Sequence, residues 1–144
     1  MELQSILKDC QIIRVINATA AGAADVNSSV VDTQGFDGVC FVAAIGALVA
    51  TQVTSLKAQH GDAANLADAA DITGAATAAM ADGDSNKMLV CDVRRPTKRY
   101  VRCVLKRATA NATIDGVVAI LYRAAKLPAA LDASISQSVG VTDS

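Results

Sequence analysis

The feature that most constrains this fold is the regular interruption of its apolar segments. Gly, Asp, Asn, Ser and Thr recur about every ten residues, a spacing typical of short strands joined by turns. Alanine, about a fifth of the chain, favours helix by intrinsic propensity, so the two signals disagree. Because the apolar stretches themselves are rich in Val and Ile, we predict strands.

This pattern predicts about eight strands. Segment 39–49 is uncharged, and both of its expected faces are apolar, which is typical of a central strand. Segment 100–107 alternates, with Val101, Cys103 and Leu105 facing one way and Arg102 and Lys106 the other. The predicted strands are residues 11–18, 28–33, 39–49, 53–59, 88–93, 100–107 and 117–122, with 66–72 as either a short strand or a helical turn. Residues 20–24, 34–38, 60–65, 82–86 and 109–115 are predicted loops or turns.

The chain is long enough for one domain with a hydrophobic core, at 144 residues. We predict an N-terminal arm over residues 1–10, either a short helix or extended, and an all-β domain over residues 11–128. That domain is expected to be a two-sheet β-sandwich or jelly roll. Residues 129–144, rich in Ser and Ala, are expected to form an extended or mobile tail.

The composition argues against several classes of partner. The net charge is −1, so there is no general attraction to nucleic acid or to an anionic membrane. Segment 38–56 lacks charge, but its apolar part, residues 39–50, is shorter than the roughly 20 residues that a membrane-spanning helix needs. The 52% hydrophobic and 19% charged content instead favours subunits that pack beside neighbours.

No set of residues predicts catalysis, a cofactor or a metal site, and we expect a protein that is not an enzyme. The lone histidine, His60, could act as a base beside Asp62, but a polar residue entering a turn explains it better. Residues 82–86 place oxygen-bearing side chains at alternate positions, yet no glutamate follows to close a calcium loop, which favours a solvated turn. The four cysteines, which lack the close pairing of zinc sites, are expected to be buried thiols: Cys10, Cys40, Cys91 and Cys103.

Basic residues concentrate in one part of the chain, on two predicted strands and the loop between them. They are Arg94, Arg95, Lys98, Arg99, Arg102, Lys106 and Arg107. Three interpretations are open: a solvated strand face, a dock for an acidic protein surface, and a nucleic-acid site. Only Tyr100 offers base stacking, so we do not expect nucleic acid. Arg94, Arg95, Lys98 and Arg99 are the candidate protein interface.

Four short segments, in this order, resemble small structural proteins of tailed-bacteriophage particles. They read TQGFDGV at 33–39, LKAQHGD at 56–62, KRYVR at 98–102 and RAAKLP at 123–128. The family is that of capsid cement, or decoration, proteins of jelly-roll type, and the resemblance covers about two-thirds of the chain, residues 30–128.

The resemblance implies a protein on the capsid exterior, made in the cytoplasm of the bacterial host, that bridges neighbouring capsid subunits. Its expected partners are the major capsid protein and itself, as a dimer or trimer, and its terminal segments would order on neighbours. Two alternatives are another phage component (head completion, tail or fibre base) and a small-ligand-binding jelly roll. The aromatic content of 3% is poor for the second.

Overall fold

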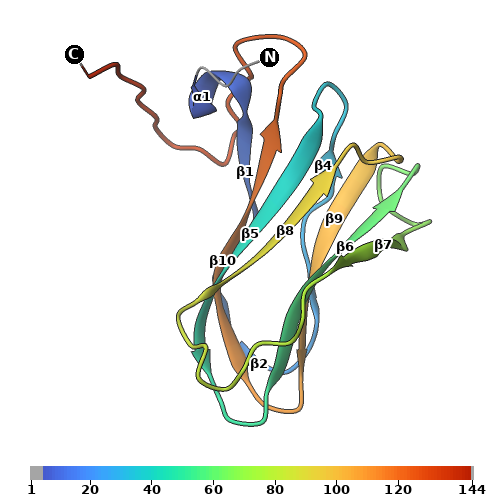
Figure 1. Ribbon diagram of the computed structural model, residues 1–144, viewed down its shortest axis with the longest axis vertical. Helices are drawn as coiled ribbons and strands as arrows, with labels where there is room; N and C mark the ends of the chain where they lie inside the picture. The colour runs from blue at the N-terminus through green and yellow to red at the C-terminus, as the bar shows by residue number, and fades with distance from the viewer. Residues whose placement is uncertain (1–4, 144) are drawn as a thin grey trace.

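The computed structural model describes residues 5–143 and consists of two antiparallel β-sheets packed face to face (Figure 1). The sheet we call the β10 sheet contains β1 (Gln11–Ile16), β2 (Thr19–Gly22), β5 (Gly38–Leu48), β8 (Met88–Arg94) and β10 (Ala112–Tyr122). The second, the β9 sheet, contains β3 (Val26–Asn27), β4 (Val31–Asp32), β6 (Val53–Gly61), β7 (Ala70–Ala76) and β9 (Tyr100–Ala108). A short helix, α1 (Ile6–Asp9), precedes β1.

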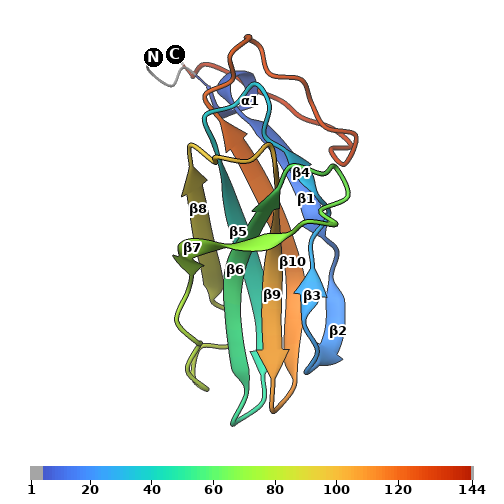
Figure 2. The same ribbon diagram turned by 90° about the vertical axis from the view of Figure 1, so that its right-hand side faces the viewer.

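The connectivity is that of a jelly roll. In one sheet the order is β1, β10, β5, β8, with β2 also pairing with β10. In the other it is β3, β9, β6, β7, with β4 also pairing with β9 (Figure 2). If β1 with β2, and β3 with β4, each count as one interrupted strand, two four-stranded sheets remain, and only β6 and β7 are sequence neighbours within one sheet. This arrangement confirms the predicted fold class, a two-sheet jelly roll of about eight strands.

The core lies between the sheets and is built from the inward-facing half of each strand. Strand β5 alternates buried and half-buried residues along its length, and β8 alternates buried with exposed ones. The predicted central strand is confirmed, because β5 lies between β10 and β8. The largest fully buried side chains are those of Phe41, Ile45, Leu56, Leu105, Ile114 and Leu121.

Three of the four cysteines are buried, as predicted. All four are free thiols, with Cys10, Cys91 and Cys103 buried and Cys40 half-buried. Burial raises the pKa of Cys103 to about 12, so this thiol stays protonated and packs as a small hydrophobic side chain.

Some predicted boundaries are wrong. Residues 20–24, predicted as a loop, largely form β2, where Gly22 pairs with Ala112 of β10. Of the strand predicted at 28–33, only Val31–Asp32 form a strand, β4; a second short piece, β3, precedes the predicted range, and both pair with β9. Residues 66–72 were predicted as a short strand or a helical turn. Only their last part is strand, because β7 begins at Ala70. These segments lie at sheet edges, where pairing with a long neighbour decides the structure more than local sequence does.

Both ends of the chain pack beside β1. The predicted N-terminal arm contains α1, and residues 1–4 lie outside the described residues. The tail, from residue 129 to 143, has no helix or strand. Its first part is nevertheless held: the Ala129 N–H donates to the Lys8 carbonyl at 2.7 Å, and the Arg14 N–H donates to Ser134 Oγ at 3.1 Å. Among residues 5–143, no helix has the length and apolar character needed to cross a bilayer.

Candidate protein interface at the loop end

Four connecting segments meet at one end of the sandwich, which we call the loop end. They are residues 33–37 between β4 and β5, 62–69 between β6 and β7, 95–99 between β8 and β9, and 123–128 after β10, all in the upper half of Figure 1. Backbone hydrogen bonds join them: Arg95 N–H to the Asp37 carbonyl at 2.8 Å and Ala125 N–H to the Gly35 carbonyl at 2.8 Å. The strand directions of the jelly roll therefore bring together segments up to about 90 residues apart.

The same end collects the four segments on which the expectation of a cement protein rests. TQGFDGV forms the β4–β5 loop and enters β5, and LKAQHGD runs up β6 and ends at Asp62. KRYVR leaves the β8–β9 loop into β9, and RAAKLP follows β10. These four segments, far apart along the sequence, thus lie at one end of the molecule.

Arg99, one of the four predicted interface residues, is held within the protein. Its guanidinium makes two hydrogen bonds with the Asp32 carboxylate, Nε to Oδ1 at 2.9 Å and Nη2 to Oδ2 at 2.8 Å. It also lies 5.1 Å from the centre of the Tyr100 ring. The hydrogen bonds from Arg99 lower the pKa of Asp32. This pair fixes the start of β9 to the end of β4 and leaves Arg99 less free to bind a partner.

Lys98 is likewise paired within the loop end. Its Nζ lies 3.0 Å from Oδ2 of Asp62, and this contact raises the pKa of Lys98. The 62–69 loop is shaped by Asp68, whose carboxylate accepts hydrogen bonds from the Asp62 and Ala63 N–H groups at 2.8 and 3.2 Å. Those bonds lower the pKa of Asp68. Lys98 therefore ties the 95–99 loop to the 62–69 loop across the end of the β9 sheet.

Arg94 and Arg95 differ from their two neighbours. Both are exposed, and neither side chain makes an ion pair or hydrogen bond with any residue between 5 and 143. Arg95 has a positive φ of 49° directly before Pro96, a strained backbone position that its N–H bond to Asp37 helps to hold. Of the predicted set, these two carry positive charge that is free to meet an acidic surface.

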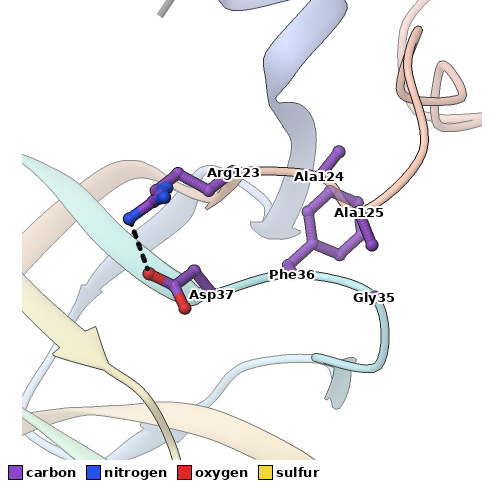
Figure 3. Close-up of a pocket in the computed structure, with 6 residues that line it drawn as sticks. All are labelled: Gly35, Phe36, Asp37, Arg123, Ala124 and Ala125. Carbon is purple, nitrogen blue, oxygen red and sulfur yellow. Dashed lines mark ion pairs between the residues drawn. The ribbon is translucent and has the colours of Figure 1, made fainter. Parts of the chain in front are cut away.

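A shallow hollow of about 340 Å³ lies between the 33–37 loop and the segment after β10 (Figure 3). The Phe36 ring lies against Ala124 and Ala125 on one side of it, and an Asp37–Arg123 ion pair of 3.5 Å lies on the other. The hollow is open and has both an apolar and a charged wall. It can accept a protruding side chain from a protein surface, and its own charges are already paired.

The remaining basic residues, Arg102, Lys106 and Arg107, do not form a single surface. Arg102 on β9 donates from Nε to the Gln59 side chain at 2.9 Å, and Lys106 is exposed on the outer face of the β9 sheet. Arg107, in contrast, is buried at the far end of the sandwich and donates to the carbonyls of Ala20, Ala24 and Ala112. Its position is consistent with the inward phase of Val101, Cys103 and Leu105 on the same strand.

The other candidate sites hold ordinary loop contacts. Asp62, the suggested partner of His60, is paired with Lys98. In the 82–86 turn, Asp82 accepts from the Thr51 N–H and Asp84 from the Ala81 N–H, so the two carboxylates serve as backbone acceptors in a turn, as predicted. Within residues 5–143, no three His, Cys, Asp or Glu side chains come together in a way that could hold a metal ion.

Sequence reasoning found the basic residues of the loop end but not their acidic partners. Asp32, Asp37 and Asp62 each stand at a strand end, beside the predicted turns. Their spacing from Lys98, Arg99 and Arg123 along the chain gives no sign of pairing, because each contact is made between different segments of the fold.

No protein-family model matches this chain, and a search of curated proteins finds no significant match.

Proposed function

We propose that this protein is a structural component of a tailed-bacteriophage particle that binds the outer surface of the icosahedral capsid and bridges neighbouring capsid subunits. The observation that carries the proposal is the convergence of all four family-like segments on the loop end. A surface that a family of binding proteins keeps in common is expected where those proteins meet a common partner.

The loop end has properties that suit such a contact. Ion pairs between loops, such as Arg99 with Asp32 and Lys98 with Asp62, hold the segments in one arrangement before binding. A pre-organised surface loses little conformational entropy on association. The unpaired charges of Arg94 and Arg95 then favour an acidic surface on the major capsid protein, and many copies on one shell make modest single contacts sufficient.

The proposed contact can be tested by binding the purified protein to capsids that lack it and measuring sedimentation at low and physiological salt. Arg94→Ser with Arg95→Ser should weaken binding about threefold to thirtyfold at low salt, given about 0.3–1 kcal/mol for each exposed charge. The salt dependence should also become shallower. Lys106→Ser is the matched control, because Lys106 is an exposed lysine on β9 away from the loop end.

The pair Lys98→Ser with Arg99→Ser serves a different purpose. These residues hold the loops together, so we expect a small loss of stability together with weaker binding. Binding that is unchanged in both double variants at low salt would contradict a dock at the loop end. Binding that is lost equally in Lys106→Ser would place the contact elsewhere.

A further inference from the structure

The middle of the outer face of the β10 sheet carries an apolar patch, bordered by Arg14, Asp92 and Arg94. The strand register brings Cys40 and Val42 of β5 beside Ile120 and Val118 of β10, and Val42 beside Val90 of β8. The outward positions of the β9 sheet are mostly polar or charged, with Lys57, Gln59, Arg102 and Lys106 there, although Val53 at the start of β6 is also exposed. An exposed apolar patch on one outer face is expected to be covered by another segment or by a partner.

The protein covers only part of this face with its own tail. Ile135 lies in a groove with Ile12 of β1, Val42 and Val118. Ser134 anchors the tail there by accepting from the Arg14 N–H. The tail therefore covers the β1 side of the sheet, where Ile135 forms one wall of the groove.

The β8 side remains open in two respects. Met88 and Val90 are 64% and 52% exposed. Strand β8 is also the free edge of the sheet, because it pairs with β5 alone among the described residues. An exposed apolar edge strand is a template for pairing with another strand.

The tail after Ile135 has the pattern of a strand that lacks a partner. Gln137, Val139 and Val141 continue the same alternate positions, and the positions between them are Ser136, Ser138 and Gly140. Val139 and Val141 are 86% and 87% exposed. Extended backbone would place both valines on one side and only small residues on the other.

The exposed tail segment and the β8 edge are separate parts of the surface. A Cβ on Gly140 would lie 3.3 Å from Cδ1 of Leu7, which places this part of the tail against α1, and α1 leads into β1. Strands β1 and β8 are the two edges of the β10 sheet, and Figure 1 shows the tail leaving the body on the α1 side. Within one chain in this arrangement the valines and the β8 edge do not meet.

We propose that residues 137–141 of one copy add as an antiparallel strand to the free β8 edge of a second copy. The proposal deepens the proposed function, because it rests on the expectation that the protein acts as an oligomer. In the register that pairs Val139 with Val90, Val141 lies beside Met88 and Gln137 beside Asp92. Each apolar side chain then meets another, and the polar one meets a carboxylate.

The inner side of this added strand also fits. Ser138 and Gly140 would face Cys91 and Leu89, which point into the sandwich. Strand β7 comes close there, since the Cys91 thiol lies 3.9 Å from the Ala75 carbonyl, so large side chains would not fit. Because each copy gives its tail at one edge and accepts a tail at the other, the contact is head-to-tail, which generates a closed ring when the rotation between copies permits.

The test is the mass of the free, full-length protein in solution, measured by light scattering after size exclusion. We expect a multiple of 14.7 kDa for the wild type. Val90→Lys and the double variant Val139→Lys with Val141→Lys should each shift the mass to that of the monomer, because association weakens about tenfold for each valine that no longer packs against the partner. Val53→Lys is the control, because Val53 is a comparably exposed valine (45%) on the β9 sheet.

Mixing the two defective proteins gives the sharpest result. The Val90→Lys protein keeps an intact tail and the tail variant keeps an intact β8 edge, so an equimolar mixture should form a 1:1 pair with one good contact. A wild type that is monomeric at high concentration would overturn the inference. So would tail variants that associate as the wild type does, or a mixture that stays monomeric.

This assay uses no capsid, so its outcome is separate from that of the proposed function. A protein that exchanges tails but never binds capsids would refute only the virion role. A monomer that binds capsids would refute only the strand exchange.

Discussion

Replacing Arg107 tests how the far end of the jelly roll is held. The buried guanidinium donates from Nε to the Ala24 carbonyl at 2.8 Å and from Nη1 to the carbonyls of Ala20 and Ala112 at 3.0 and 2.8 Å. These carbonyls belong to the β2 region, the loop before β3 and the start of β10. One side chain therefore joins short edge strands that have few ladder hydrogen bonds of their own.

The expected cost of Arg107→Leu follows from these bonds. A hydrogen bond to a charged donor is worth about 1.5–3 kcal/mol, but removing a buried charge recovers part of its desolvation cost. The bonds to Ala20 and Ala24 are only partly buried, so water can replace the arginine there, whereas the Ala112 bond is buried. We therefore expect a net loss of about 2–4 kcal/mol in the free energy of unfolding.

Urea denaturation at neutral pH measures this loss, with Lys106→Leu as the control on the neighbouring, exposed position. The control should change stability by no more than about 0.5 kcal/mol. A loss below about 1 kcal/mol for Arg107→Leu would show that the three carbonyls do not depend on the guanidinium and would refute the reasoning.

Three further predictions concern single groups. Gly38→Ala should lower the free energy of unfolding by about 1–3 kcal/mol in urea denaturation, because its Cβ would collide with the Tyr122 hydroxyl; an unchanged midpoint would contradict this. Because Arg99 lowers the pKa of Asp32, that pair contributes stability above the ordinary carboxyl value of 3.8 that is lost as the pH falls below it. The stability gap between wild type and Asp32→Asn should therefore shrink on acidification, and a gap that stays constant with pH would refute the pairing. The Cys103 thiol, with a pKa of about 12, should resist alkylation at pH 8 until denaturant is added, as followed by mass spectrometry.

The long strands could be predicted from sequence because their signals are local. The alternation over Tyr100–Ala108 defines a strand and its buried side, and the uncharged run of Gly38–Leu48 defines a central strand, both without reference to the rest of the chain. The turn chemistry at residues 34–38 and 82–86 placed the breaks correctly. Together these features were enough to predict two packed sheets.

The edge strands and the site could be predicted only in part, because they depend on which segments become neighbours. Residues Thr19–Gly22 have no strand signal and form β2 only because β10 offers an edge. The charges of the 94–99 run were evident, but their division into paired Lys98 and Arg99 and unpaired Arg94 and Arg95 depends on Asp32 and Asp62, which lie far away in sequence. Sequence periodicity likewise shows that β5 is apolar on both sides, but not that its outer face is only half covered.

If the proposed role is correct, the most direct test is the number of copies of this protein on purified phage particles, measured by quantitative mass spectrometry against the major capsid protein. Bridging of neighbouring subunits across an icosahedral shell predicts on the order of hundreds of copies per particle. About a dozen copies or fewer would indicate a connector, tail or fibre-base component instead, and absence from the particle would contradict a virion role altogether.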